Sequence, residues 1–144
     1  MKIQQVSVFI ENKPGRLIEM IDVLASANIN IRAMSIADTS DFGILRLIVD
    51  KPEESIKVLK ELGCTASLTS VLGVGLKDEK GEFVKALRVL SDNKVDVEYM
   101  YTFISCSNKK AYVILRVSDE DKAIEAYNKS GHTLLTMKEV TSNN

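Results

Sequence analysis

The amino-acid sequence contains two copies of one pattern, about 66 residues apart. Gly15 in the first copy corresponds to Gly81 in the second, and apolar residues follow both at the same spacing. Because a repeated apolar pattern reflects a repeated structural unit, we expect two similar units. The matched pairs are Leu17 and Phe83, Ile21 and Leu87, Leu24 and Leu90, Ile29 and Val95, Ile31 and Val97, and Met34 and Met100.

The second half of the pattern also repeats, with Gly63 matching Gly131, and the spacing there is 68 residues. The two additional residues enter near the polar run 106–110, which predicts a hairpin tip. The copies meet around residues 71–73 with hardly any linker, and Gly73-Val74-Gly75 predicts a kink between them. We therefore expect two domains, at residues 1–70 and 71–144.

Each copy predicts the order strand, helix, strand, strand, helix, strand. In the first copy, strands are predicted at residues 6–10, from residue 29, at 43–50 and at 65–70. Helices are predicted at residues 14–27 and from residue 50. Asp50-Lys51-Pro52-Glu53 has the form of a capping box with proline in the first turn, so Asp50 is predicted to cap the second helix. Gly63 is predicted to end that helix as a C-terminal cap.

The second copy contains the clearest strand, an alternation of apolar and polar residues over 95–103. Ser118 is predicted to cap its second helix, Gly131 to end that helix, and residues 134–140 to form a last strand. This βαββαβ order predicts an α+β fold: two tandem ferredoxin-like domains, each an antiparallel sheet with both helices on one face.

The turn before the first helix of the first copy points to a function. Asn12 is suited to cap the helix, Pro14 to occupy its first turn, and Gly15 to allow close approach. These residues would leave backbone N–H groups at the positive end of the helix dipole, where a small carboxylate can bind. The second copy retains an acidic residue, Asp78, and Gly81, but lacks the proline.

Two stretches, Glu11–Leu17 and Ala25–Ile31, together with the duplication, resemble the ACT domain, an amino-acid-sensing module of metabolic enzymes. The resemblance implies that a free amino acid binds between two domains, at the loop after the first strand of one and the second-strand region of the other. We expect the ligand-binding residues to be Asn12, Lys13, Pro14, Gly15, Arg16, Leu17, Asn28, Asn30, Met100 and Tyr101. A weaker second site would comprise Asp78, Gly81, Glu82, Phe83 and Asp96, because its acids would repel a carboxylate.

Structural roles remain open for the same residues. Asn12 and Pro14 would suit any helix start, and Asn28 and Asn30 would suit any turn between a helix and a strand. Aromatic residues on the strand of Tyr101 and the methionines Met34 and Met100 more often pack in a core or an interface than contact a ligand.

Composition excludes several classes of function. The chain has 19 basic and 20 acidic residues without a basic stripe, so we expect no nucleic-acid partner. An RNA-binding role on this fold would need aromatic and basic residues on the central strands, and the strand 42–49 is mostly aliphatic. Cys64 and Cys106 lie far apart, which indicates free thiols and no metal site. Without an apolar segment of membrane-spanning length, the sequence predicts a cytoplasmic protein and no membrane partner.

Catalysis is not expected, because His132 is the only histidine and no nucleophile is paired with it in the sequence. We expect no cofactor. The sequence therefore predicts a regulatory protein that binds a free amino acid and acts on an enzyme or another protein. Sheet edges left unpaired make a homodimer the expected assembly. The alternative is a non-catalytic regulatory or structural subunit of an amino-acid-metabolism enzyme complex, with a vestigial ligand site.

Overall fold

The computed structural model describes residues 2–38, 41–104 and 110–141, and Cys106 and most of the predicted hairpin tip lie outside them. The chain divides into two compact units. The first unit contains Gln4–Thr69 and is joined by Val140, and the second contains Ser70–Glu139 and is joined by Lys2 and Ile3.

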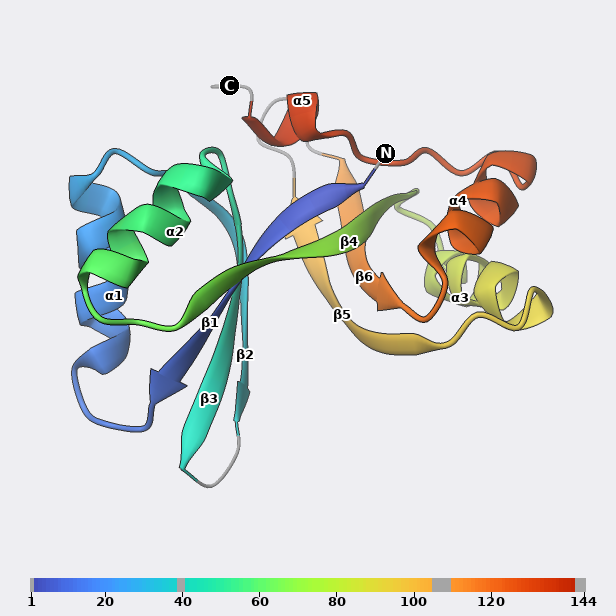
Figure 1. The fold of residues 1–144 in the computed structure, drawn as a ribbon. Helices are drawn as coiled ribbons and strands as arrows, with labels where there is room; N and C mark the ends of the chain where they lie inside the picture. The colour runs from blue at the N-terminus through green and yellow to red at the C-terminus, as the bar shows by residue number, and fades with distance from the viewer. Residues whose placement is uncertain (1, 39–40, 105–109, 142–144) are drawn as a thin grey trace. The chain divides into compact units, whose positions relative to one another are not determined.

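The first unit is an antiparallel sheet covered on one face by two helices. Its strands are β1 (Ile3–Glu11), β2 (Ile31–Asp38), β3 (Phe42–Val49) and the beginning of β4 (Ala66–Leu76), in the order β2-β3-β1-β4. The helices α1 (Arg16–Ser26) and α2 (Pro52–Glu61) lie side by side on the same face (Figure 1). Alternate residues of the central strands pack under them in a core that includes Val6, Val8, Ile10, Met20, Leu24, Leu45, Leu47 and Leu59.

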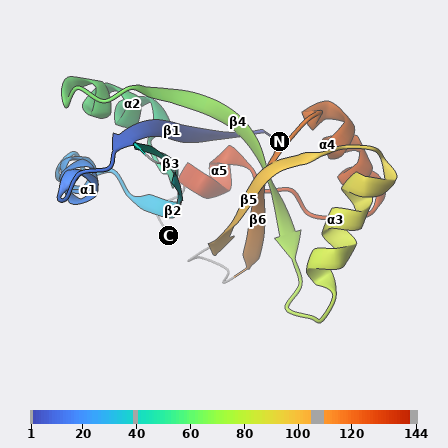
Figure 2. The same ribbon diagram turned by 90° about the horizontal axis from the view of Figure 1, so that it is seen from below.

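The second unit has the same plan. Its strands are the rest of β4, β5 (Val97–Ile104) and β6 (Ala111–Val117), in the order β4-β6-β5. The helices α3 (Glu82–Asp92) and α4 (Glu120–Lys129) lie side by side on one face of β5 and β6 (Figure 2). Together the two units confirm the predicted pair of tandem ferredoxin-like domains, although among the described residues the second unit has no counterpart of the last strand of the first.

The predicted last strand at 134–140 is wrong. Leu134 makes only an isolated antiparallel bridge to Val74, and the short helix α5 (Met137–Thr141) follows. Thr136 caps this helix: its hydroxyl accepts from the Glu139 N–H at 3.3 Å and donates to the Glu139 carboxylate at 3.1 Å. This side-chain start favours a helix over continued strand pairing.

The predicted kink at Gly73-Val74-Gly75 is also wrong, because these residues lie within the continuous strand β4. The backbone of Gly75 donates to the Thr133 carbonyl at 2.7 Å, and that of Leu135 donates to the Gly73 carbonyl at 2.7 Å. A Cβ on Gly73 would lie 2.7 Å from the Cβ of Leu135. Glycine is required here because another segment packs against the strand.

Helices α1 to α4 end in the same left-handed turn. The first residue after each C-cap has a positive φ: 61° at Asn28, 87° at Gly63, 56° at Lys94 and 79° at Gly131. The following N–H then donates to the carbonyl five residues earlier, as from Ile29 to Leu24 at 3.0 Å. The predicted caps at Gly63 and Gly131 are confirmed. Asn28 lies in the turn between a helix and a strand, which is the structural alternative to its predicted role in ligand binding.

A pair of hydrogen bonds fastens the start of β2 to the start of α2. The Asp50 carboxylate accepts from the Asn30 N–H at 2.9 Å, and the Asp50 N–H donates to the Asn30 carbonyl at 3.1 Å. Asp50 is therefore not a helix cap, and Lys51 occupies the N-cap position without a side-chain hydrogen bond that caps the helix. The strand also begins at Ile31 rather than at the predicted Ile29, since Ile29 and Asn30 are used by these turns.

The second unit repeats this arrangement with different side chains. The Ser118 hydroxyl accepts from the Asp96 N–H at 3.0 Å, and the Ser118 N–H donates to the Asp96 carbonyl at 3.0 Å. The predicted cap at Ser118 is therefore wrong. Asp119 caps α4 instead by accepting from the Lys122 N–H at 3.1 Å. The same pair of backbone positions is thus joined in both units.

Replacing Gly131 by alanine should lower the free energy of unfolding by about 1 kcal/mol. The reason is that the left-handed conformation costs a residue with a Cβ about 1–2 kcal/mol of conformational free energy. No atom lies within 4 Å of the added Cβ, so the effect is conformational. Lys94→Gly is the matched control and should leave stability unchanged or higher. Urea unfolding measures both, and equal losses from the two changes would contradict this account.

Asp50→Ala should lower the free energy of unfolding by about 1 kcal/mol, because the Asn30 N–H loses its acceptor. Asp50→Asn keeps an acceptor oxygen at the same place and should cost less. Urea unfolding of both variants measures the difference. If asparagine costs as much as alanine, the charge of Asp50 matters rather than its hydrogen bond.

Candidate functional site

The loop between β1 and α1 differs from its predicted form at the helix start. Helix α1 begins at Arg16, and Gly15 is its N-cap in a left-handed conformation with φ 84°. Asn12 and Pro14 precede the helix, so the prediction that they cap it and fill its first turn is wrong. The Arg16 N–H donates to the Lys13 carbonyl at 3.2 Å, which closes a tight turn across Pro14 and Gly15.

This loop is open to solvent, and its backbone bonds both locally and to Asp41 just before β3, whose carbonyl accepts from the Asn12 N–H at 3.4 Å. Residues 11–15 are all exposed, and no atom lies within 4 Å of a Cβ placed on Gly15. The Lys13 N–H donates to the Glu11 carbonyl at 2.8 Å. The Lys13 ammonium lies 2.9 Å from the Glu11 carboxylate, and this hydrogen bond holds the pKa of Glu11 below its ordinary value. The space in front of the N-terminus of α1 is therefore unobstructed.

The Arg16 side chain lies back along its own unit. One guanidinium nitrogen is 3.3 Å from the Glu19 carboxylate, and the other donates to the Cys64 sulfur at 3.4 Å. Cys64 is the residue after the turn that ends α2, and it is buried. The Arg16 side chain thus joins the start of α1 to the end of α2.

The second unit has the same loop backbone without the proline. Gly81 is the left-handed N-cap of α3 with φ 84°, and the Glu79 N–H donates to the Lys77 carbonyl at 2.9 Å. Here the loop borders a cavity of about 1020 Å³, which Asp78, Glu82 and Phe83 of the predicted second site line together with other residues. The glycine, rather than the proline, is what the loop geometry requires.

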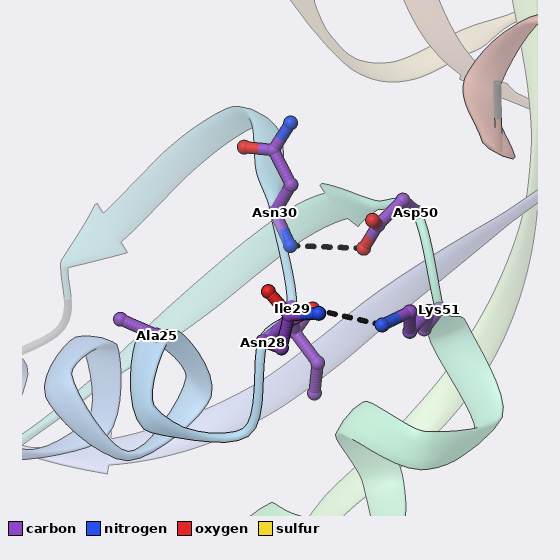
Figure 3. Close-up of a pocket in the computed structure, with 6 residues that line it drawn as sticks. All are labelled: Ala25, Asn28, Ile29, Asn30, Asp50 and Lys51. Atoms are coloured by element: carbon purple, nitrogen blue, oxygen red, sulfur yellow. Dashed lines mark hydrogen bonds between the residues drawn. The ribbon is translucent and has the colours of Figure 1, made fainter. Parts of the chain in front are cut away.

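A separate pocket of about 460 Å³ lies at the other end of α1. Figure 3 shows its lining residues: the Lys51 ammonium donates to the Asn28 carbonyl at 2.9 Å, and Asn30 is bonded through its backbone to Asp50. The Asn30 side chain extends away from Lys51 (Figure 3). Sequence reasoning assigned Asp50 and Lys51 to a helix cap and missed their place in this pocket.

The predicted site residues therefore separate into groups within each unit. Asn12–Leu17 and Asn28–Asn30 lie at opposite ends of α1, whose 11 residues span about 16 Å. Asp96 is likewise separated from Asp78–Phe83 by the length of α3, and it does not line the cavity. Met100 and Tyr101 lie on β5, where they pair with Leu115 and Ile114.

Within residues 2–38, 41–104 and 110–141, no group of three or more His, Cys, Asp or Glu side chains is placed to hold a metal ion. No helix in this part of the chain is long and apolar enough to cross a membrane.

Comparison with known proteins identifies the family. Residues 1–141 match the family described as an ACT domain pair. Protein BT0572 from Bacteroides thetaiotaomicron, known from a crystal structure, is 40% identical with a TM-score of 0.90, over 99% of this chain and 97% of that one. No match was found among the curated proteins.

Two more distant structures share the fold. The regulatory subunit of aspartate kinase from Thermus thermophilus, in its ligand-free form, is 18% identical with a TM-score of 0.62, over 88% of this chain and 91% of that one. Aspartate kinase from Synechocystis is 20% identical with a TM-score of 0.58, over 94% of this chain and 26% of that one. On the family match and the BT0572 likeness, the chain belongs to the family of ACT domain pairs.

Proposed function

We propose that this ACT domain pair is a non-catalytic regulatory protein that binds a free amino acid at the loop Asn12–Leu17. The observation that carries the proposal is the exposed, left-handed Gly15 in front of α1, with open space where a side chain would be. The N-terminus of a helix attracts a carboxylate through its N–H groups and dipole. Membership of an amino-acid-sensing family supports the same ligand class.

The chemistry of the loop suits an amino acid. The carboxylate would accept hydrogen bonds from the first turn of α1, and the Asn12 amide offers both a donor and an acceptor. The Arg16 guanidinium is held by Glu19 and Cys64, so the backbone rather than this side chain would contact the carboxylate. Binding at this point would stabilise the folded arrangement of the loop, which a partner protein could then recognise.

The second candidate function is a non-catalytic subunit of an enzyme complex. The Thermus thermophilus protein is a regulatory subunit of aspartate kinase, and this chain covers 91% of its length. A pair of domains with this fold and size can therefore serve as a separate regulatory subunit. In that case the Asn12–Leu17 loop need not bind any ligand.

The first candidate predicts that a free amino acid stabilises the protein. At about 100 times its dissociation constant, the ligand should add about 2.7 kcal/mol to the free energy of unfolding. Thermal unfolding in the presence of each of the twenty amino acids measures this. Asn12→Ala should weaken binding, and Asp78→Ala, the matched change in the second unit, should have a smaller effect. If no amino acid at millimolar concentration raises the melting temperature, the subunit function is favoured.

We further propose a homodimer in which β2 contributes to the interface. This strand forms an edge of the sheet, and its Met34 and Ile36 are 43% and 47% exposed. Apolar side chains on an unpaired edge favour pairing with another strand.

Light scattering should therefore give twice the chain mass of 16.0 kDa. Ile36→Lys should shift the protein towards the monomer, because a lysine on an edge opposes strand pairing. Ile18→Lys on α1, at a position that is 66% exposed, is the control and should leave the dimer intact. A monomer before any substitution would contradict the proposal.

A further inference from the structure

The cavity of about 1020 Å³ lies wholly within the second unit and has chemistry of its own. The end of β4, the start of α3, the tips of β5 and β6 and the segment after α4 enclose it. Both acidic and basic side chains line it, and apolar side chains form part of its wall.

Two matched positions beside this space carry different side chains in the two units. In the first unit, Arg16 at the start of α1 donates to Cys64 after α2 and also pairs with Glu19 of its own helix. In the second unit the matched residues are Glu82 and His132, and both line the cavity. Glu82 pairs with Lys85 of its own helix at 3.3 Å. The helices of this unit are joined elsewhere, by the Tyr127 hydroxyl, which donates to the Ala86 carbonyl at 2.8 Å.

Glu82 places a shielded carboxylate on the cavity wall. Its exposed fraction is 7%, although it is the first residue of α3. A carboxylate is stabilised at that end of the helix dipole. Its partner Lys85 has a side chain that is 65% exposed, so its ammonium can move into solvent and leave the carboxylate to another cation. Carboxylates this buried need a cationic or hydrogen-bonding partner.

His132 also lines the cavity, in the segment after α4. The Ser130 hydroxyl donates to the Tyr127 carbonyl at 3.0 Å, and it lies 2.7 Å from Nδ1 of His132. The rings of His132 and the buried Tyr127 are in edge-to-face contact, with centroids 5.4 Å apart. These contacts hold His132 against the end of α4.

The remaining wall suits an apolar group. Phe83 and Ile104 both line the cavity and are 45% and 66% exposed. We propose that this cavity binds a small organic amine, with its protonated nitrogen on the Glu82 carboxylate and its apolar body against Phe83 and Ile104. This ligand class differs from the amino-acid carboxylate proposed for the Asn12–Leu17 loop.

Phenethylamine is the probe, and 3-phenylpropionate, which carries a carboxylate in place of the amine, is its matched control. Isothermal titration should show binding of the amine and none of the acid. Glu82→Gln removes the charge and keeps the shape, and should weaken amine binding about tenfold or more. Glu79→Gln changes an exposed carboxylate on the same cavity and should have a smaller effect.

Phe83→Ala gives a test that does not depend on a buried residue. The loss of this exposed ring should weaken phenethylamine binding several-fold, whereas Val84→Ala, the neighbouring exposed position, should not. Asn12→Ala should leave amine binding unchanged, so a failure of the amino-acid proposal remains separate from this one. Binding of 3-phenylpropionate as tight as that of the amine, equal effects of Glu82→Gln and Glu79→Gln, or no binding of the amine would overturn the proposal.

Discussion

Each unit depends on backbone turns that require a residue in the left-handed conformation, with a positive φ. Gly15 and Gly81 turn the chain from a strand into the first helix, and the turn after every long helix uses another residue with positive φ. These turns return the chain within one or two residues, so each helix lies back on the sheet that it has just left. The apolar cores form only because both helices reach the same face of the sheet.

The two units share a backbone and differ in the side chains that it presents. The same two hydrogen bonds join Asn30 to Asp50 in the first unit and Asp96 to Ser118 in the second. The residue type differs between the units at both positions. The duplication therefore preserves backbone hydrogen bonding while leaving the exposed chemistry free to change. At the starts of α1 and α3, a guanidinium in one unit corresponds to a buried carboxylate in the other, so the same backbone position carries opposite charges.

Much of the fold could be predicted from the sequence, because the apolar periodicity and the glycines after the helices are local signals. The candidate site was less predictable. Asn12 and Asp50 both precede a proline near a helix start, so each was interpreted as a cap. In the structure the helix begins after Gly15, and Asp50 bonds to Asn30, which is distant in sequence. The predicted last strand is wrong for a different reason, because Thr136 and Glu139 start a helix within that segment.

The sequence by itself determined the duplication, the order of the elements as far as α4 and the family, because all three rest on local patterns that recur at a fixed spacing. Tertiary structure alone decided which side chains share a space. Helix length placed Asn12 and Asn30 at opposite ends of α1, and the packing of segment 133–135 on β4 required Gly73. It also brought the end of β4, the start of α3 and the segment after α4 to the border of one cavity in the second unit. Such contacts join residues far apart in the chain, and no local pattern records them.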